Sequence, residues 1–129
     1  MAVSVPGLVI SLEANSDMSA DQYKAVNVVL GTVDFRVEVE TTEANFCVGV
    51  LQNKPSHAGA AATVQVSGIT RMIASGALNA GIRVSPGASG RVVASGQGDQ
   101  PIGILLDSPG TAGDICSVLL LPQAAGLLP

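Results

Sequence analysis

Short apolar runs rich in β-branched residues alternate with glycine-rich segments through residues 46–121 of this chain. In order, the runs are FCVGVL, ATVQVSG, GIRVSPGASGRVVASG, PIGILL and DICSVLLL. The segments between them, such as AGAAAT, SGALNAG and SPGTAGD, have the composition of turns. Strands of this length, separated by turns at this spacing, predict an all-β domain that is either a small barrel or a sandwich.

The length of 129 residues suits a single domain with a core of its own. Aromatic side chains are scarce: the chain has no Trp, one Tyr (Tyr23) and two Phe (Phe35 and Phe46). Val, Ile, Leu and Ala must therefore fill the core, and each of them buries less area than an aromatic side chain would.

Charged residues make up only 12% of the chain, about half the usual share. The mean hydropathy is +0.47, but no apolar run approaches the roughly 20 residues needed to span a bilayer. A formal net charge of −4 and scattered Lys and Arg residues disfavour nucleic acid as a partner. The N-terminus lacks the basic region of a signal peptide. We expect the excess apolar surface to be covered by self-association or by docking on a larger assembly.

Residues 1–16 are predicted to form an N-terminal arm followed by a first strand, broken at Pro6-Gly7. The arm either lies on the sheet edge of a neighbouring subunit or is an ordinary first strand of the domain. Residues 17–122 are predicted to form the β-domain, and residues 123–129 are predicted to form an apolar C-terminal tail. We take as candidate contacts with a larger assembly or a neighbouring subunit the apolar residues of the two ends, namely Val3, Val5, Leu8, Val9, Ile10, Leu120, Leu127 and Leu128.

Local patterns predict individual elements. Ser19 and Gln22 fit a capping box, which predicts one short helical turn before Tyr23. Residues 23–30 are strand-like. Residues 33–40 give the clearest half-buried strand, because Val33, Phe35, Val37 and Val39 alternate with Asp34, Arg36, Glu38 and Glu40. Residues 85–90 (SPGASG) predict the connection of a hairpin, and residues 109–114 (PGTAGD) predict another.

The sequence offers little with which to build a catalytic, cofactor-binding or metal site. His57 is the only histidine and has only Ser56 beside it, without a third orienting group. The glycines of GQG (residues 96–98) lack the strand and helix of a dinucleotide fingerprint. The acids Asp99, Asp107 and Asp114 lie beside turns and do not have the spacing of a calcium loop. We therefore predict no enzyme activity, no cofactor and no metal ion.

Cys47 and Cys116 each lie in an apolar strand pattern, which favours buried reduced thiols. A disulfide requires that the two strands pair or face each other, and the sequence leaves that open.

Three stretches resemble the capsid cement, or head decoration, proteins of tailed bacteriophages. They are DMSADQYKAV (17–26), VGVLQNKPSHAGAAATVQVSGITRMIASGALNAG (48–81) and GRVVASGQGDQPIGILLDSPGTAGDICSVLLL (90–121). The resemblance implies a tulip-like or barrel-like β-domain that binds the outside of an assembled capsid as a dimer or trimer and bridges neighbouring major capsid subunits. It also implies a virion location, after synthesis in the host cytoplasm.

Two other functions stay open from the sequence. One is a β-module elsewhere in a virion, as part of a tail or fibre. The other is a small barrel that binds a small ligand or glycan, although sugar sites usually need the aromatic platforms that this chain lacks.

Overall fold

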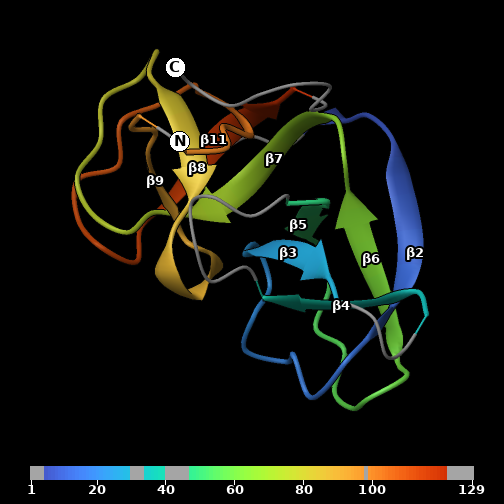
Figure 1. Cartoon of the computed structure of the whole chain (residues 1–129). Helices are drawn as coiled ribbons and strands as arrows, with labels where there is room; N and C mark the ends of the chain where they lie inside the picture. The colour runs from blue at the N-terminus through green and yellow to red at the C-terminus, as the bar shows by residue number, and fades with distance from the viewer. Residues whose placement is uncertain (1–4, 30–33, 40–46, 98, 122–129) are drawn as a thin grey trace.

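The computed structural model describes residues 5–29, 34–39, 47–97 and 99–121, with the side chain of residue 88 left out. Within these residues the chain forms eleven strands in two sheets and one short 3-10 helix, Ala88–Gly90. Figure 1 shows the two sheets side by side, with the chain passing from one to the other between β6 and β7. The predicted all-β fold class is confirmed.

One sheet is a closed five-stranded barrel. Its strands are β2 (Val9–Ala14), β3 (Ala25–Val28), β4 (Arg36–Val39), β5 (Gly49–Leu51) and β6 (Ala61–Gln65). They follow the order β2-β4-β3-β5-β6, and β6 pairs back to β2. Neighbouring strands are antiparallel except for β2 and β4, which are parallel. Closure leaves the barrel without a free sheet edge.

The other sheet has six antiparallel strands in the order β1-β7-β11-β10-β8-β9. Its strands are β1 (Val5–Pro6), β7 (Gly68–Ile73), β8 (Arg83–Pro86), β9 (Val92–Ala94), β10 (Gly103–Leu105) and β11 (Ile115–Leu120). The longest pairing joins β7 and β11 over six residues. Both hairpins expected from the sequence are present: β8 pairs with β9 across residues 87–91, and β10 pairs with β11 across residues 106–114.

Aliphatic side chains and two methionines fill the interior, as the scarcity of aromatic residues requires. Inside the barrel, Met18 and Leu51 pack with Val26, Val37 and Val64. The second cluster lies under the six-stranded sheet around Met72, Leu105 and Val118, and it includes Ala25 and Val50 from the barrel. The two sheets therefore share buried contacts and support each other.

Of the two alternatives for the N-terminal segment, residues 5–14 match the ordinary first strand of the domain, because both segments pair within their own chain. Val5 and Pro6 pair with Ile69 and Gly68 of β7. Residues 9–13 pair with β6, and Glu13 and Ala14 also pair with β4. Since β2 closes the barrel, residues 9–14 are a structural part of the domain rather than a segment that precedes it.

The short helical turn predicted from Ser19 and Gln22 is wrong, because both side chains have other partners. The Asp17 carboxylate accepts hydrogen bonds from the Ser19 amide and hydroxyl, at 3.0 and 2.7 Å. The Gln22 amide donates instead to the carbonyl oxygen of Gln52. This segment consists of turns, and Tyr23 has a positive φ of 68° that delays the start of β3 until Ala25.

The strand predicted over residues 33–40 is shorter than its alternation suggests. β4 begins at Arg36, because Phe35 has a φ of 61° and lies in a turn. Val37 is buried in the barrel as expected, whereas Phe35 is 72% exposed. Val33 and Glu40 lie outside the described residues. Within the described residues, no helical segment is long and apolar enough to cross a membrane.

Candidate interaction surface

The residues with the most reactive side chains do not assemble into a site. Lys54, Ser56 and His57 are exposed in the loop between β5 and β6. The His57 Nδ1 lies 3.1 Å from the neighbouring carbonyl oxygen of Ala58. Within the part of the chain that the structure describes, no group of three or more His, Cys, Asp or Glu side chains is placed to hold a metal ion.

The three acids of the last third of the chain bind backbone amides. Asp99 accepts a hydrogen bond from the Gly96 amide, and Asp107 accepts one from Ser117 at 3.0 Å. Asp114 accepts from the amides of Gly110 and Thr111, and these bonds hold the pKa of its carboxyl below the usual range. These carboxylates thus have a structural role in fixing the ends of strands and turns.

Two hollows in the described surface do not suit a glycan or small ligand. One, of about 40 Å³, lies between the two sheets against Cys47, Ile102 and Leu121, and ligand pockets usually reach about 300 Å³ or more. The other, of about 330 Å³, is open to solvent beside Asp107, Pro109 and Asp114 and has no aromatic lining. Neither hollow favours the ligand-binding alternative.

Neither cysteine is in a disulfide, and the two differ in exposure. Cys47 is half-buried, and Cys116 is buried. The Cys116 Sγ lies 3.4 Å from the carbonyl oxygen of Met72. Burial raises the pKa of the Cys116 thiol to about 11, and the negative charge of Asp107 adds to the effect. Since the thiolate is the reactive form, Cys116 is an inert core residue.

The raised pKa of Cys116 predicts a loss of stability at alkaline pH. Between the ordinary thiol value of 9.0 and about 11, the unfolded chain releases the proton while the folded chain keeps it. The free energy of unfolding should therefore fall as pH rises through this window, with a slope of at most about 1.4 kcal/mol per pH unit from this group. Urea unfolding at about pH 8 and about pH 10.5 measures this fall in the free energy of unfolding. Cys116→Ala should lose less stability between the two pH values; an equal loss would contradict the assignment.

The candidate contact residues have different positions in the structure. Val5, Leu8 and Val9 are 53%, 60% and 41% exposed and so are accessible to a partner. Ile10 is half-buried and packs against the barrel core. Leu120 is only 5% exposed and belongs to the core under the six-stranded sheet, so its assignment as a contact residue is corrected. Val3, Leu127 and Leu128 lie outside the described residues.

A row of apolar side chains crosses the outward side of the six-stranded sheet. Cross-strand partners lie on the same side of a sheet, and the register places Val5 beside Ile69, Ile69 beside Leu119, and Leu119 beside Ile104. Ile69, Leu119 and Ile104 are half-buried and belong to neither core cluster. An antiparallel sheet with one side in water normally alternates apolar and polar residues, so this row is typical of an interaction surface.

Arginines accompany the apolar row. Arg83 lies beside Ile104 in the register, and Arg71 lies two residues along β7 from Ile69, on the same side of the sheet. Both arginines are exposed. We refer to Val5, Ile69, Arg71, Arg83, Ile104 and Leu119 as the outer sheet face.

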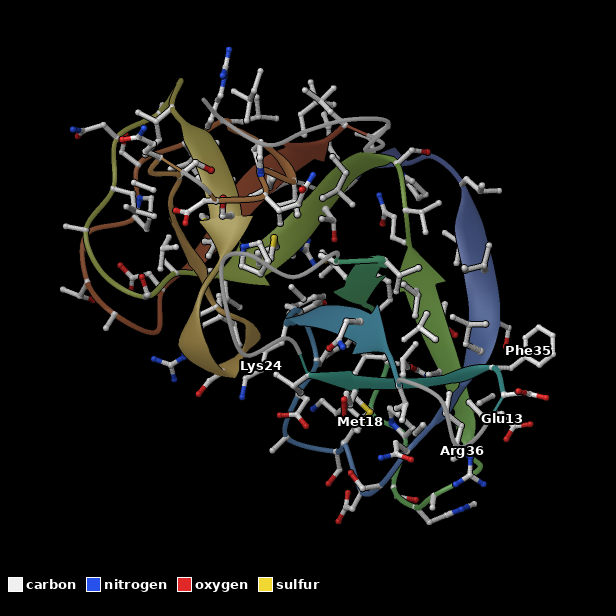
Figure 2. All side chains as sticks on the ribbon, in the orientation of Figure 1. Glu13, Met18, Lys24, Phe35 and Arg36 are labelled. Carbon is white, nitrogen blue, oxygen red and sulfur yellow. The ribbon has the colours of Figure 1, made fainter. Side chains whose placement is uncertain are left out.

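A second exposed feature lies on the barrel at the start of β4. Phe35 is 72% exposed and has a left-handed backbone, which is rare for a bulky residue. The carbonyl oxygen of Phe35 accepts a hydrogen bond from the Glu13 amide, and the Glu13 carboxylate lies 3.5 Å from the Arg36 Nε. Figure 2 shows Phe35 pointing away from the barrel, beside Glu13 and Arg36. We refer to Glu13, Asp34, Phe35, Arg36 and Glu38 as the β4 rim.

The sequence did not single out most of these residues. Ile69, Ile104 and Leu119 lie in continuous apolar runs, where neighbouring positions look equally suited to the core. Arg71, between Thr70 and Met72, is the sequence signal for the outward side of this strand, because a charged residue within an apolar strand normally faces away from the core. Phe35 was assigned to the buried side of a strand, since the positive φ that exposes it has no sequence signature here.

Comparison with known proteins gives a likeness in fold. No protein-family model matches the chain, and no curated protein matches it. Among solved structures, the chain is similar to the N base of the head fibre gp8.5 of bacteriophage phi29, with a TM-score of 0.69. The alignment covers 88% of this chain and 93% of that one, at 14% sequence identity. At this identity the likeness establishes a shared fold over almost the whole domain.

Proposed function

We propose that this chain is a structural protein of a tailed-phage virion that binds the outside of the head and cements neighbouring major capsid subunits. The observation that carries the proposal is the fold shared with the base of a phage head fibre over 88% of the chain. The resemblance of residues 17–26, 48–81 and 90–121 to head decoration proteins supports the same role. The proposed partner is the major capsid protein, and the proposed action is binding without catalysis.

The exposed apolar residues and the small size suit such a role. A decoration protein that binds only the assembled shell stabilises that shell by mass action, by about RT ln(1 + [L]/Kd) for each independent site. Many copies, each bridging a subunit boundary, sum to a large effect even when each contact is weak.

Cementing predicts that heads with bound protein withstand more heat. Mature heads of the phage that encodes the chain would be prepared without it and then saturated with purified protein. The temperature at which DNA becomes accessible to a fluorescent dye should rise on saturation. The variants Ser56→Ala and His57→Ala should raise the release temperature as much as the wild type does. Both side chains are exposed in a loop that is not assigned to the capsid contact. An unchanged release temperature at full occupancy would remove the cementing role.

The same fold likeness favours a second candidate, the base of a fibre attached to the head. A fibre base would also bind heads but would have no need to strengthen the shell. Saturable binding with an unchanged release temperature is therefore the result that the fibre alternative predicts.

Leu8→Asp is predicted to weaken binding to heads without unfolding the protein. Leu8 is the most exposed of the candidate contact residues that the structure describes, so the charge remains in water in the free protein. If the side chain is buried against the capsid, the loss of its burial weakens binding by at least about tenfold. Cosedimentation with heads measures the affinity. Ser56→Asp adds the same charge on an exposed loop and should bind as the wild type does; equal affinity for Leu8→Asp would exclude Leu8 from the contact.

A further inference from the structure

The outer sheet face combines apolar side chains with positive charge. Val5, Ile69, Leu119 and Ile104 follow one another across four strands, with Arg83 at the end of the row and Arg71 in the next row. Two ion pairs are found among the described residues, Lys24–Asp21 and Arg36–Glu13. Neither pair involves Arg71 or Arg83. A surface that covers this face favourably must therefore offer apolar contact together with carboxylates.

The β4 rim of the same chain has this complementary chemistry. It has three carboxylates, on Glu13, Asp34 and Glu38, against the single guanidinium of Arg36, and that guanidinium is already paired with Glu13. Among them is the 72% exposed phenyl ring of Phe35. An exposed aromatic ring surrounded by charge is a typical anchor of a protein–protein contact.

The two surfaces lie on different sheets of one molecule. The outer sheet face belongs to β1, β7, β11, β10 and β8, whereas the rim belongs to β2 and to β4 with the turn before it. In Figure 2, Phe35 points away from the barrel at the side remote from the six-stranded sheet. A chain therefore cannot bring its own rim onto its own outer sheet face, but a second copy can supply the rim.

Strand pairing between copies is disfavoured by the topology. The barrel is closed, and the β1 edge of the other sheet is only two residues long among the described residues. At the opposite edge, β9 is partly covered by a bridge between Ala74 and Val92. Association between copies must therefore rely on side-chain surfaces such as the outer sheet face and the rim.

We propose that copies of this chain associate head to tail, with the β4 rim of one copy seated on the outer sheet face of the next. The Phe35 ring packs on the apolar row, and the rim carboxylates lie near Arg71 and Arg83. Because two different surfaces meet, the contact repeats from copy to copy and closes into a ring when the rotation allows. The inference concerns the protein alone and does not depend on what it binds in the virion.

Two blocked variants test the contact. The face variant carries Arg71→Glu and Arg83→Glu, and the rim variant carries Asp34→Lys and Phe35→Asn. All four positions are exposed, and Asn tolerates the left-handed backbone of residue 35 better than Phe does. Both variants should keep the far-UV circular dichroism and melting temperature of the wild type. Ala112→Glu, on the exposed turn between β10 and β11, is the charge control.

Sedimentation velocity measures the outcome. Wild type and Ala112→Glu should associate as concentration rises, and each blocked variant should associate at least about tenfold more weakly. An equal mixture of the two blocked variants should form a heterodimer and no larger species. The face variant supplies an intact rim and the rim variant supplies an intact outer sheet face, so only one contact can form. Association of the wild type should also weaken with salt.

Three results would overturn the proposal. The first is a wild type that stays monomeric at every concentration. The second is a mixture of blocked variants that forms no heterodimer. The third is a rim variant that associates like the wild type, which would indicate a symmetric contact between two sheet faces. A failure here leaves the head-binding experiments unaffected, because those measure a different partner.

Discussion

Leu120→Asp is expected to abolish the folded state. The Leu120 side chain is 5% exposed and lies in the core cluster with Met72, Leu105 and Val118. An aspartate there must either bury a charge or take up a proton, and both cost several kcal/mol, on the scale of the total stability of about 5–15 kcal/mol. Circular dichroism and urea unfolding measure the loss.

Leu119→Asp is the matched control, because Leu119 is the neighbouring residue and lies on the opposite side of β11. Leu119 is half-buried on the outer sheet face and outside both core clusters. This variant should fold, with a smaller loss of stability, and should associate with other copies more weakly. If Leu120→Asp folds like the wild type and loses only binding, the assignment of Leu120 to the core is wrong.

Gly103→Val is expected to cause the second large loss of stability. Gly103 lies in β10, opposite Leu120 of β11 and Val84 of β8. A Cβ at this position would overlap the backbone carbonyl of Leu119, so β10 would have to move away from β11. Since β10 lies between two strands, the shift would disturb both pairings and the core beneath them. We expect a loss of at least about 3 kcal/mol, read from the midpoint of urea unfolding.

Gly76→Ala controls for the loss of glycine itself. A Cβ at Gly76 meets no atom within 4 Å, so this substitution should leave stability unchanged or raise it slightly. Equal midpoints for Gly103→Val and the wild type would contradict the close packing of β10 on β11.

Much of the fold was predictable because its strands and turns have strong local signals. The turn at residues 85–90 and the turn at residues 109–114 specified two hairpins, and both form. The N-terminal segment was harder, since an extended apolar segment pairs equally well with its own sheet or with a neighbour's. Only the tertiary structure shows Val5 on β7 and residues 9–13 on β6.

The candidate surface was less predictable, because it depends on which side of a strand each apolar residue faces. In the run DICSVLLL, Leu119 and Leu120 are chemically identical, yet one is on the outer sheet face and the other is in the core. Strand register decides between them, and a shift of one residue would exchange the two roles. Phe35 differs for another reason, since a turn with positive φ replaced the expected strand.

Direct binding of the purified protein to phage particles tests the proposed role most directly. Under the proposed function, mature heads and separated tails of the encoding phage would each be titrated with labelled protein and sedimented. We predict saturable binding to heads, at a copy number compatible with the symmetry of the shell, and no saturable binding to tails. Saturable binding to tails alone, or no binding to either particle, would contradict a structural role on the head.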